Sequence, residues 1–256
     1  MTLFFVSASI SAQSTDLDKK LFAALRKGNT AGIQVLLDQG AHVNARDGAN
    51  GVTPLVEAAA HTDLPTVKLL LQRGADVNAH AADDEEPLSA ALIGPSSVLV
   101  PEAVIATVQL LIDHGADVQF AGTRGKTPLM WATGRESLLP ALTLLLGKGA
   151  RSDTRDDAGD TALAWSAKNL QPPAMSALLA HGAQVNTRNN KGITPLMIAA
   201  RTGNLPIIKL LLTHGADPNV KDNTGQTAAD YARTERDLRP ATRTKVLTLL
   251  QANRSK

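Results

Sequence analysis

The stretch Gly125-Lys126-Thr127 has the residue types that end a phosphate-binding loop, so nucleotide chemistry is considered first. A P-loop carries a glycine five residues before Gly125, and a strand leads into it. Phe120 occupies that position here. Thr127 followed by Pro128 instead fits the start of a helix, where the hydroxyl caps and proline needs no N–H partner. We therefore expect no nucleotide site and no cofactor.

Three histidines have the residue type of zinc ligands: His114, His181 and His214. Each directly precedes a glycine at the end of an apolar segment. Packed helices lie about 8–10 Å apart, whereas zinc needs its nitrogen ligands at about 2.0–2.1 Å. A cation near a helix C-terminus interacts favourably with the helix dipole, which explains the histidines and also Lys148 at the equivalent place. We expect no metal site.

No arrangement typical of hydrolytic catalysis is present in the sequence. It lacks HExxH and GxSxG, and it shows no Ser, His and acid grouping in a recognisable frame. Asp156, Asp157 and Asp160 are close together, and hydrogen bonds within a turn account for them. The absence of Cys excludes disulfides, thiolate catalysis and cysteine zinc sites. We expect no catalytic residues and no enzyme activity.

These residues stand in a repeating frame. A glycine able to end a helix in the left-handed conformation recurs in steps of 34, 41, 34, 33 and 33 residues. The glycines are Gly40, Gly74, Gly115, Gly149, Gly182 and Gly215. A threonine that fits a helix cap recurs in step with them, except that Glu86 replaces it in the third unit. The threonines are Thr53, Thr127, Thr161, Thr194 and Thr227. A period of about 33 residues, with two helices and a turn per unit, predicts a solenoid.

The repeated segments resemble the ankyrin repeat: TPLVEAAA at Thr53, TPLMWAT at Thr127, TALAWSA at Thr161 and TPLMIAA at Thr194. The resemblance covers roughly residues 16–253. It implies an all-α, ankyrin-type helix-turn-helix solenoid with short turn or hairpin fingers. Residues 13–256 are then a single array of about seven units with terminal caps.

Two tryptophans share one position of the repeat. Trp131 and Trp165 stand where other units have Ile198 and Tyr231. The resemblance implies that this position is apolar and buried between helices, so we predict that both tryptophans belong to the core. A paired-tryptophan ligand platform is the alternative.

The third unit departs from the frame through an insertion near residues 94–102. Glu86 lies 29 residues before Gly115, against 21 residues from Thr53 to Gly74, so eight residues are inserted. Pro101 reopens a helix that we expect to be about a turn longer than its neighbours. Acids replace the turn glycine and the capping threonine at residues 83–86, and acids are favourable before a helix N-terminus.

Residues 1–12 differ from the rest. A brief apolar run at residues 3–6 is followed by small residues and then by a polar stretch, which indicates the end of a signal peptide cleaved after Ser11 or Ala12. On this interpretation the chain resembles exported bacterial ankyrin-repeat proteins and is located in the periplasm. The alternative is an apolar tail that covers the first repeat of a cytoplasmic protein.

The resemblance also implies that a protein partner binds the concave face, through the turns and the residue pairs after each Ala-Ala. The predicted contact residues are Arg26, Lys27, His61, Asp83, Asp84, Glu85, Arg124, Lys126, Arg135, Asp157, Lys168, Asn169, Asn190, Lys191 and Arg201. Arg135, Lys168 and Arg201 are expected to form a basic row on successive repeats. Mixed charge favours a folded protein over DNA, whose phosphates select uniform basicity.

The leading hypothesis is a non-catalytic, monomeric protein-binding module of the bacterial cell envelope. The formal net charge of +2 implies no strong field for nucleic acid. No apolar run reaches the ~20 residues that span a bilayer. One alternative is an inhibitor or immunity-type protein for an exported enzyme. A second is a small hydrolase that uses the insertion as a pocket wall.

Overall fold

The computed structural model describes residues 16–48, 50–94 and 101–253. Within these ranges the chain forms fourteen α-helices, two 3-10 turns and no strand, apart from one isolated bridge between Asp47 and Val52. The prediction of an all-α fold is confirmed. The predicted leader and residues 95–100 of the insertion lie outside the described residues.

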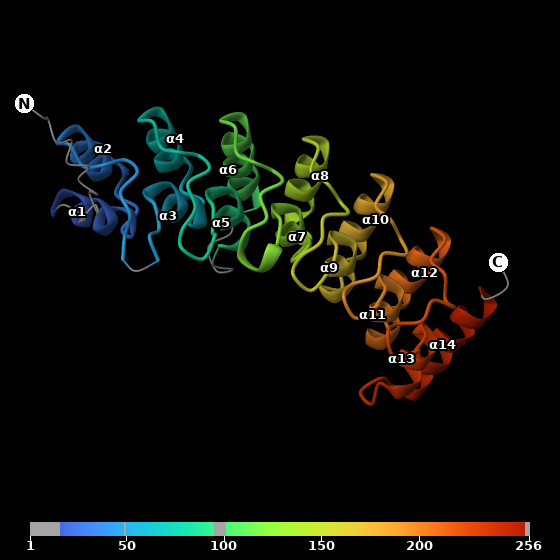
Figure 1. Cartoon of the computed structure of the whole chain (residues 1–256). Helices are drawn as coiled ribbons and strands as arrows, with labels where there is room; N and C mark the ends of the chain where they lie inside the picture. Colours follow the sequence, from blue (N-terminus) through green and yellow to red (C-terminus); the bar gives the residue numbers. More distant parts are fainter. Residues whose placement is uncertain (1–15, 49, 95–100, 254–256) are drawn as a thin grey trace, which may run out of the picture.

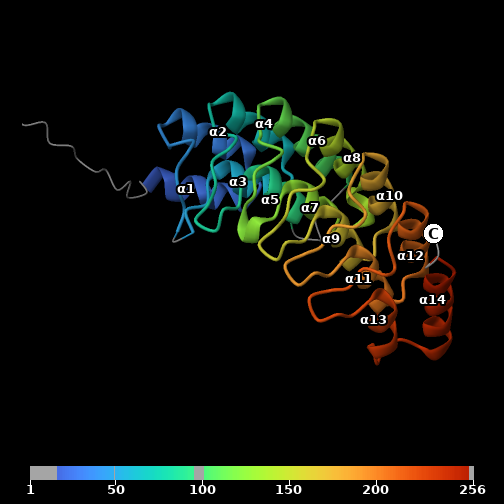
Figure 2. The ribbon, with the colours of Figure 1, turned by 45° about the vertical axis from the view of Figure 1, so that its right-hand side comes forward.

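The helices form pairs that stack side by side into a curved array (Figure 1, Figure 2). The odd-numbered helices line the inner side of the bend and the even-numbered ones the outer side (Figure 1). The inner helices are α1 (Asp16–Leu25), α3 (Pro54–Ala60), α5 (Pro87–Ile93), α7 (Pro128–Ala132), α9 (Ala162–Lys168), α11 (Pro195–Thr202) and α13 (Ala228–Thr234). The outer helices are α2 (Thr30–Asp38), α4 (Leu64–Gln72), α6 (Pro101–Asp113), α8 (Leu139–Gly147), α10 (Pro172–Ala180), α12 (Leu205–Thr213) and α14 (Pro240–Ala252). The 3-10 turns are η1 (Thr123–Gly125) and η2 (Glu136–Leu138).

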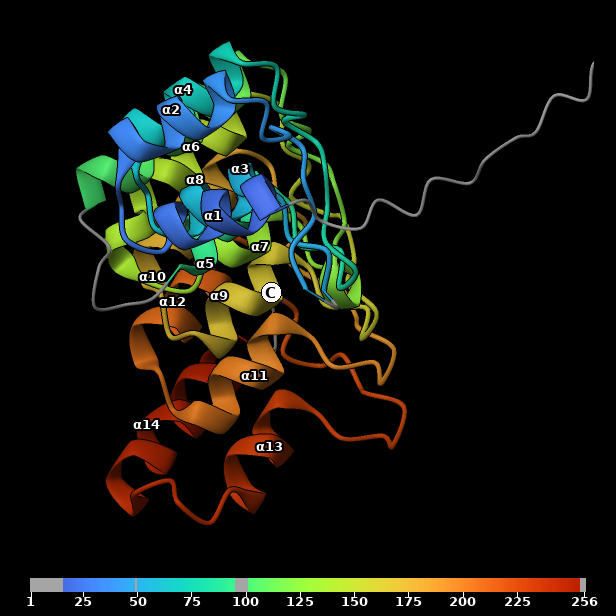
Figure 3. The same cartoon turned by 90° about the vertical axis from the view of Figure 1, so that its left-hand side faces the viewer.

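The loop that leads from each outer helix to the next inner helix projects to one side of both layers, as the view along the array shows (Figure 3). We call the tips of these loops the fingers, defined here by residues 82–85, 123–126, 156–160, 189–193 and 222–226. The fingers and the inner helices together border the concave face.

Threonine caps start most of the inner helices, as the repeat pattern predicts. In α3, α7, α9 and α11 the threonine hydroxyl accepts a hydrogen bond from the N–H three residues later, at 3.3–3.4 Å. Thr227 pairs instead with Asp230 in a capping box. Each such cap satisfies one of the N–H groups that a helix start leaves without an intrahelical partner.

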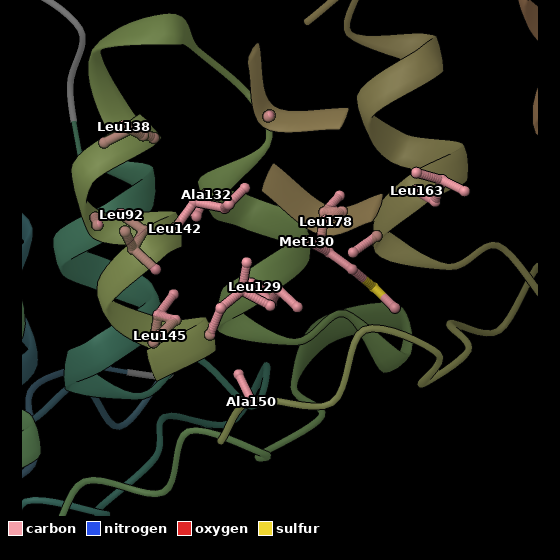
Figure 4. Close-up of a cluster of buried hydrophobic side chains, with 14 of the residues drawn as sticks. Leu92, Leu129, Met130, Ala132, Leu138, Leu142, Leu145, Ala150, Leu163 and Leu178 are labelled. Atoms are coloured by element: carbon pink, nitrogen blue, oxygen red, sulfur yellow. The ribbon is translucent and has the colours of Figure 1, made fainter. Parts of the chain in front are cut away.

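Leucines from both layers build one continuous core. Leu129, Leu142 and Leu145 converge between α7 and α8, and their side chains are at most 1% exposed (Figure 4). Neighbouring pairs repeat this packing, because each pair buries the apolar side of the next. Helix α6 has 13 residues where α4 and α8 have 9, which confirms the longer helix predicted after the insertion.

Side-chain amides join four of the repeats to the repeat that follows. The Asn44 amide nitrogen donates to the carbonyl of Gly74 at 3.3 Å, and its oxygen accepts from the Asp76 N–H at 2.9 Å. Asn78, Gln119 and Asn186 make the same two bonds to the following repeat. We call this double hydrogen bond the amide clamp. It satisfies a carbonyl left open at the left-handed end of an outer helix.

Repeat four has only half of the amide clamp. Asp153 stands where the other repeats have an amide, and its carboxylate accepts the Gln184 N–H at 3.0 Å. An ionised carboxylate has no hydrogen to donate, so it cannot bond the carbonyl of Gly182.

We predict that Asp153→Asn raises the free energy of unfolding by about 1 kcal/mol, since one net hydrogen bond contributes about 0.5–1.5 kcal/mol. The reverse change at the equivalent site, Asn186→Asp, should lower it by a similar amount. Urea unfolding measures both, with the midpoint shifting while the slope stays constant. Midpoints unchanged in both variants would show that the amide clamp does not stabilise the array.

Candidate functional site

Adjacent fingers are tied together by main-chain hydrogen bonds. The Asp157 N–H donates to the carbonyl of Arg124 at 3.1 Å, and the Asn190 N–H donates to that of Ala158 at 3.0 Å. The Asn223 N–H continues the series to Lys191, also at 3.0 Å. These fingers therefore form a fixed edge of the concave face rather than a set of independent loops.

The two tryptophans hold a lysine between them. The Lys126 ammonium lies 4.1 Å from the ring centroid of Trp131 and 4.0 Å from that of Trp165. Both rings are half-buried and pack against the core, so the prediction that they belong to the core holds only in part. The rings border the concave face because their repeat position points between the inner helices and the fingers, where Lys126 covers them. We call Trp131, Lys126 and Trp165 the indole–lysine stack.

Carboxylates of the next fingers fix the aromatic rings. Asp156 accepts the indole N–H of Trp165 at 2.9 Å, and Asp222 accepts the hydroxyl of Tyr231 at 2.8 Å. Burial and the bond to Asp222 raise the pKa of Tyr231 to about 12. Burial acts to raise the pKa of Asp222, but hydrogen bonds from Gln226, Thr224 and Tyr231 outweigh it and lower the value to about 2.

A groove of about 410 Å³ lies between the last fingers and the inner helices α9, α11 and α13. It brings together four of the predicted contact residues: Lys168, Asn190, Lys191 and Arg201. Ile193, Ile198 and Tyr231 supply apolar surface, and Asp160 supplies a carboxylate. The groove therefore offers apolar contact beside three cations.

Not every cation of the groove is available to a ligand. Lys168 forms an ion pair with the buried carboxylate of Asp160, and its ammonium lies 4.8 Å from the ring centroid of Trp165. Asp160 also accepts the side-chain amide of Asn189 at 2.9 Å. The charge of Lys168 is thus largely compensated inside the protein, and its ring contact connects the groove to the indole–lysine stack.

Arg135 does not continue the basic row. Helix α7 ends at Ala132, and the Arg135 guanidinium donates to the carbonyl of Leu92 at the end of α5, at 3.0 Å. Gly134 takes the repeat position of Lys168 and Arg201, so the row that we predicted lacks a member in repeat four. Asn169 likewise bonds Thr133 of the preceding repeat, at 3.1 and 3.3 Å.

The remaining predicted contacts lie at the first fingers and helix ends. Arg26 pairs with Asp47, and His61 lies 3.7 Å from the carboxylate of Glu57. Lys27 is exposed at the end of α1. In the repeat-three finger the Asp83 carbonyl accepts the hydroxyl of Thr123, Asp84 lies 3.5 Å from His80, and Glu85 is half-buried. The roles of all these residues in partner binding stay predictions.

The histidines close helices, as predicted. The Nδ1 atoms of His114, His181 and His214 each lie 2.8 Å from the carbonyl oxygen four residues earlier. Among the described residues, no group of three or more His, Asp or Glu side chains is placed to hold a metal ion. None of the described helices combines the length and apolarity needed to cross a membrane.

A larger hollow of about 960 Å³ lies near the C-terminal end of the array, between α12 and α14. Leu212, Leu249 and Pro218 line it, together with polar groups such as Lys209. None of the predicted contact residues reaches it.

Models of the ankyrin repeats match residues 3–81, 135–222 and 173–237, which together are most of the chain. This chain belongs to the ankyrin-repeat family. The ankyrin matches leave residues 82–134 uncovered, and this stretch contains the insertion, Lys126 and Trp131.

Solved ankyrin repeat domains align with about nine tenths of the chain. The human ASB11 ankyrin repeat domain aligns with a TM-score of 0.73 and 26% identity, covering 91% of this chain and 96% of that one. The Bcl-3 ankyrin repeat domain aligns with a TM-score of 0.71 at 24% identity, covering 90% and 97%. At 24% identity, the Bcl-3 likeness shows the fold.

Among curated proteins, the B-cell lymphoma 3 protein homolog of Mus musculus is 29% identical over 151 residues. That alignment covers 56% of this chain and 31% of the relative, so the chain spans less than a third of that protein's length. Ankyrin-family membership supports a protein–protein interaction module. Export and a bacterial setting stay predictions.

The indole–lysine stack is the feature that sequence reasoning missed. The recurrence of tryptophan at one repeat position, with lysine directly before the capping Thr127, was the available signal. The stack forms because Lys126 contacts Trp165 of the adjacent repeat, and the repeat spacing alone does not specify such a contact.

A buried glutamate, Glu86, directly follows the finger of residues 82–85. Glu86 is 1% exposed and makes no capping hydrogen bond with its side chain, so the expectation of simple capping is wrong. Its carboxyl group instead contacts the hydroxyl of Ser89 at 3.2 Å. Burial raises the pKa of Glu86 to about 8, despite this hydrogen bond. Burial, helped by Asp83, also raises the pKa of Glu85.

We predict that Glu86 makes the array less stable as pH rises. Between pH 4.5 and about 8 the folded chain holds a proton that the unfolded chain has released, so stability falls by at most about 1.4 kcal/mol per pH unit. Glu86→Gln should flatten this slope and stabilise the protein most at pH 8. Urea unfolding at a series of pH values tests this.

The exposed Glu102 of α6 gives the control for this effect. Glu102→Gln should keep the wild-type slope, because an exposed carboxylate changes little on unfolding. Equal slopes in all three proteins would contradict the buried, protonated state of Glu86.

Proposed function

We propose that this chain is a non-catalytic protein-binding module that holds a folded partner against its concave face, at repeats four to six. The observation that supports this most is the groove beneath the last fingers. It gathers Lys168 of repeat five and Lys191 and Arg201 of repeat six around an apolar floor of Ile198 and Tyr231. A mixed apolar and charged surface on a rigid scaffold is typical of a specific protein contact.

The fixed fingers favour tight binding. Because main-chain bonds join neighbouring fingers and the amide clamp joins repeats, little conformational freedom is lost when a partner binds. Preorganisation of this kind raises affinity without additional contact area.

Export to the bacterial periplasm is part of the proposal and rests on the residue pattern before residue 13. An inhibitor of an exported enzyme would use the same groove, so the identity and activity of the captured partner distinguish these two roles. The hydrolase alternative has no supporting observation in the described residues.

The test compares two surfaces of the same repeats. We predict that Lys191→Glu combined with Arg201→Glu abolishes capture of the native partner from cell extract, because both substitutions reverse charge in the groove. Lys209→Glu, an exposed site on the outer helix α12, is the matched control and should capture normally. Quantitative mass spectrometry of the captured proteins gives the readout.

Folding must be shown to be equal in these variants. Surface changes shift the free energy of unfolding by about 0.5 kcal/mol or less, so thermal midpoints should nearly coincide. If the double variant captures the same proteins as the control, the groove is not the binding surface.

A further inference from the structure

Lys126 is a cation without a carboxylate partner in the described chain. Its ammonium lies between the faces of Trp131 and Trp165, and no acid of the described residues is within ion-pair distance of it. Asp156, whose charge favours the charged form of Lys126, accepts the indole N–H of Trp165. Burial lowers the pKa of Lys126, and Arg124 and Lys168 lower it further.

Lys168, at the same surface, differs from Lys126 because an acid compensates its charge. It contacts the ring of Trp165 at a longer distance and neutralises the buried Asp160. Lys126 has the closer ring contacts but no such acid, so its three N–H donors have no carboxylate to bond. Lys126 is only half-buried, so part of its side chain reaches the surface.

The indole–lysine stack is continuous with the groove. Trp165 contacts both Lys126 and Lys168, and Lys168 lines the groove together with Lys191 and Arg201. Neither Lys191 nor Arg201 forms an ion pair with an acid of the described residues. Uncompensated positive charge therefore lies on Lys126 in repeat four and on Lys191 and Arg201 in repeat six, with the compensated Lys168 between them.

We propose that Lys126 anchors a carboxylate of an acidic segment in the protein partner, which then continues across the groove to Lys191 and Arg201. This inference rests on the proposed concave-face binding and names its partner chemistry. The two indoles hold the lysine side chain in place before binding, so the carboxylate gains a charge-assisted hydrogen bond with little further ordering. A preordered aromatic and cationic centre of this kind is typical of a binding hot spot.

The charges and covered rings favour a carboxylate over the other candidates. A cationic ligand would be repelled by Lys126 and Arg124, and the space between the indoles is already filled by Lys126. Single-stranded nucleic acid binds through open aromatic faces on which bases stack. Here Lys126 covers one face of each indole, so those faces are not open to a base.

The proposal is tested with a short Glu-rich peptide on the full chain. Trp131 and Trp165 are the only tryptophans of the sequence, so indole emission reports directly on the indole–lysine stack. We expect saturable binding that weakens with salt, and no binding of the same peptide with Gln in place of Glu. Lys126→Met, which keeps the aliphatic contact but removes the charge, should weaken binding about tenfold or more. Lys126→Arg should restore most of it.

Lys148→Met is the matched control in the same repeat, because Lys148 lies at the end of outer helix α8 and pairs with Asp113. It should change affinity by no more than about twofold. Circular dichroism of each variant shows whether the fold is kept, and Lys126→Arg keeps the test valid if Lys126→Met unfolds.

Three results would overturn the proposal: no binding of the Glu peptide, equal binding of the Gln peptide, or tighter binding of a single-stranded oligonucleotide. Loss of the native partner with Lys191→Glu and Arg201→Glu but not with Lys126→Met would also overturn it, while leaving concave-face binding intact. Retention of the partner by every variant would instead count against the proposed function itself.

Discussion

An outer helix that ends at a left-handed glycine leaves carbonyl groups without intrahelical donors, and the preceding repeat supplies the donor. The amides of Asn44, Asn78, Gln119 and Asn186 each bond such a carbonyl and accept an N–H two residues further on. Two bonds from one planar group fix the distance and the rotation between neighbouring repeats. The stack of helices, the ladder of fingers and the alignment of the concave face all depend on that fixed register.

This register explains how residues of the same repeat position come to act together. Trp131 and Trp165 lie far apart in sequence, but one repeat step places both rings about 4 Å from the same ammonium. Lys126 belongs to the finger just before Trp131, so the stack joins one repeat to the next through its side chains as well as its main chain. A repeat protein thus obtains a compact aromatic and cationic centre without any long-range chain crossing.

The fold could be predicted from the sequence because it is set by local rules that recur. A capping threonine, a first-turn proline and a helix-ending glycine each act within a few residues, and their spacing identifies the solenoid. The candidate site was less accessible to the same reasoning. The resemblance located Lys168, Lys191 and Arg201 at the concave face, but Arg135 was aligned by its charge rather than by its repeat position. Whether a lysine pairs with an acid or with an indole depends on contacts across repeats, which spacing does not determine.

The pairing of charges inside the scaffold limits the residues that are available for binding. Asp160 compensates the charge of Lys168, and Asp47 compensates that of Arg26. These two predicted contact residues therefore attract a charged partner only weakly. Where an acid is missing, the protein uses aromatic faces to hold the cation, as at Lys126, and the charge stays available. Glu86 is a charge that the scaffold removes. Its burial favours the protonated form, so it adds no negative charge beside the finger of residues 82–85. The specificity of such a surface therefore depends less on how many charged residues border it than on which of them the scaffold leaves uncompensated.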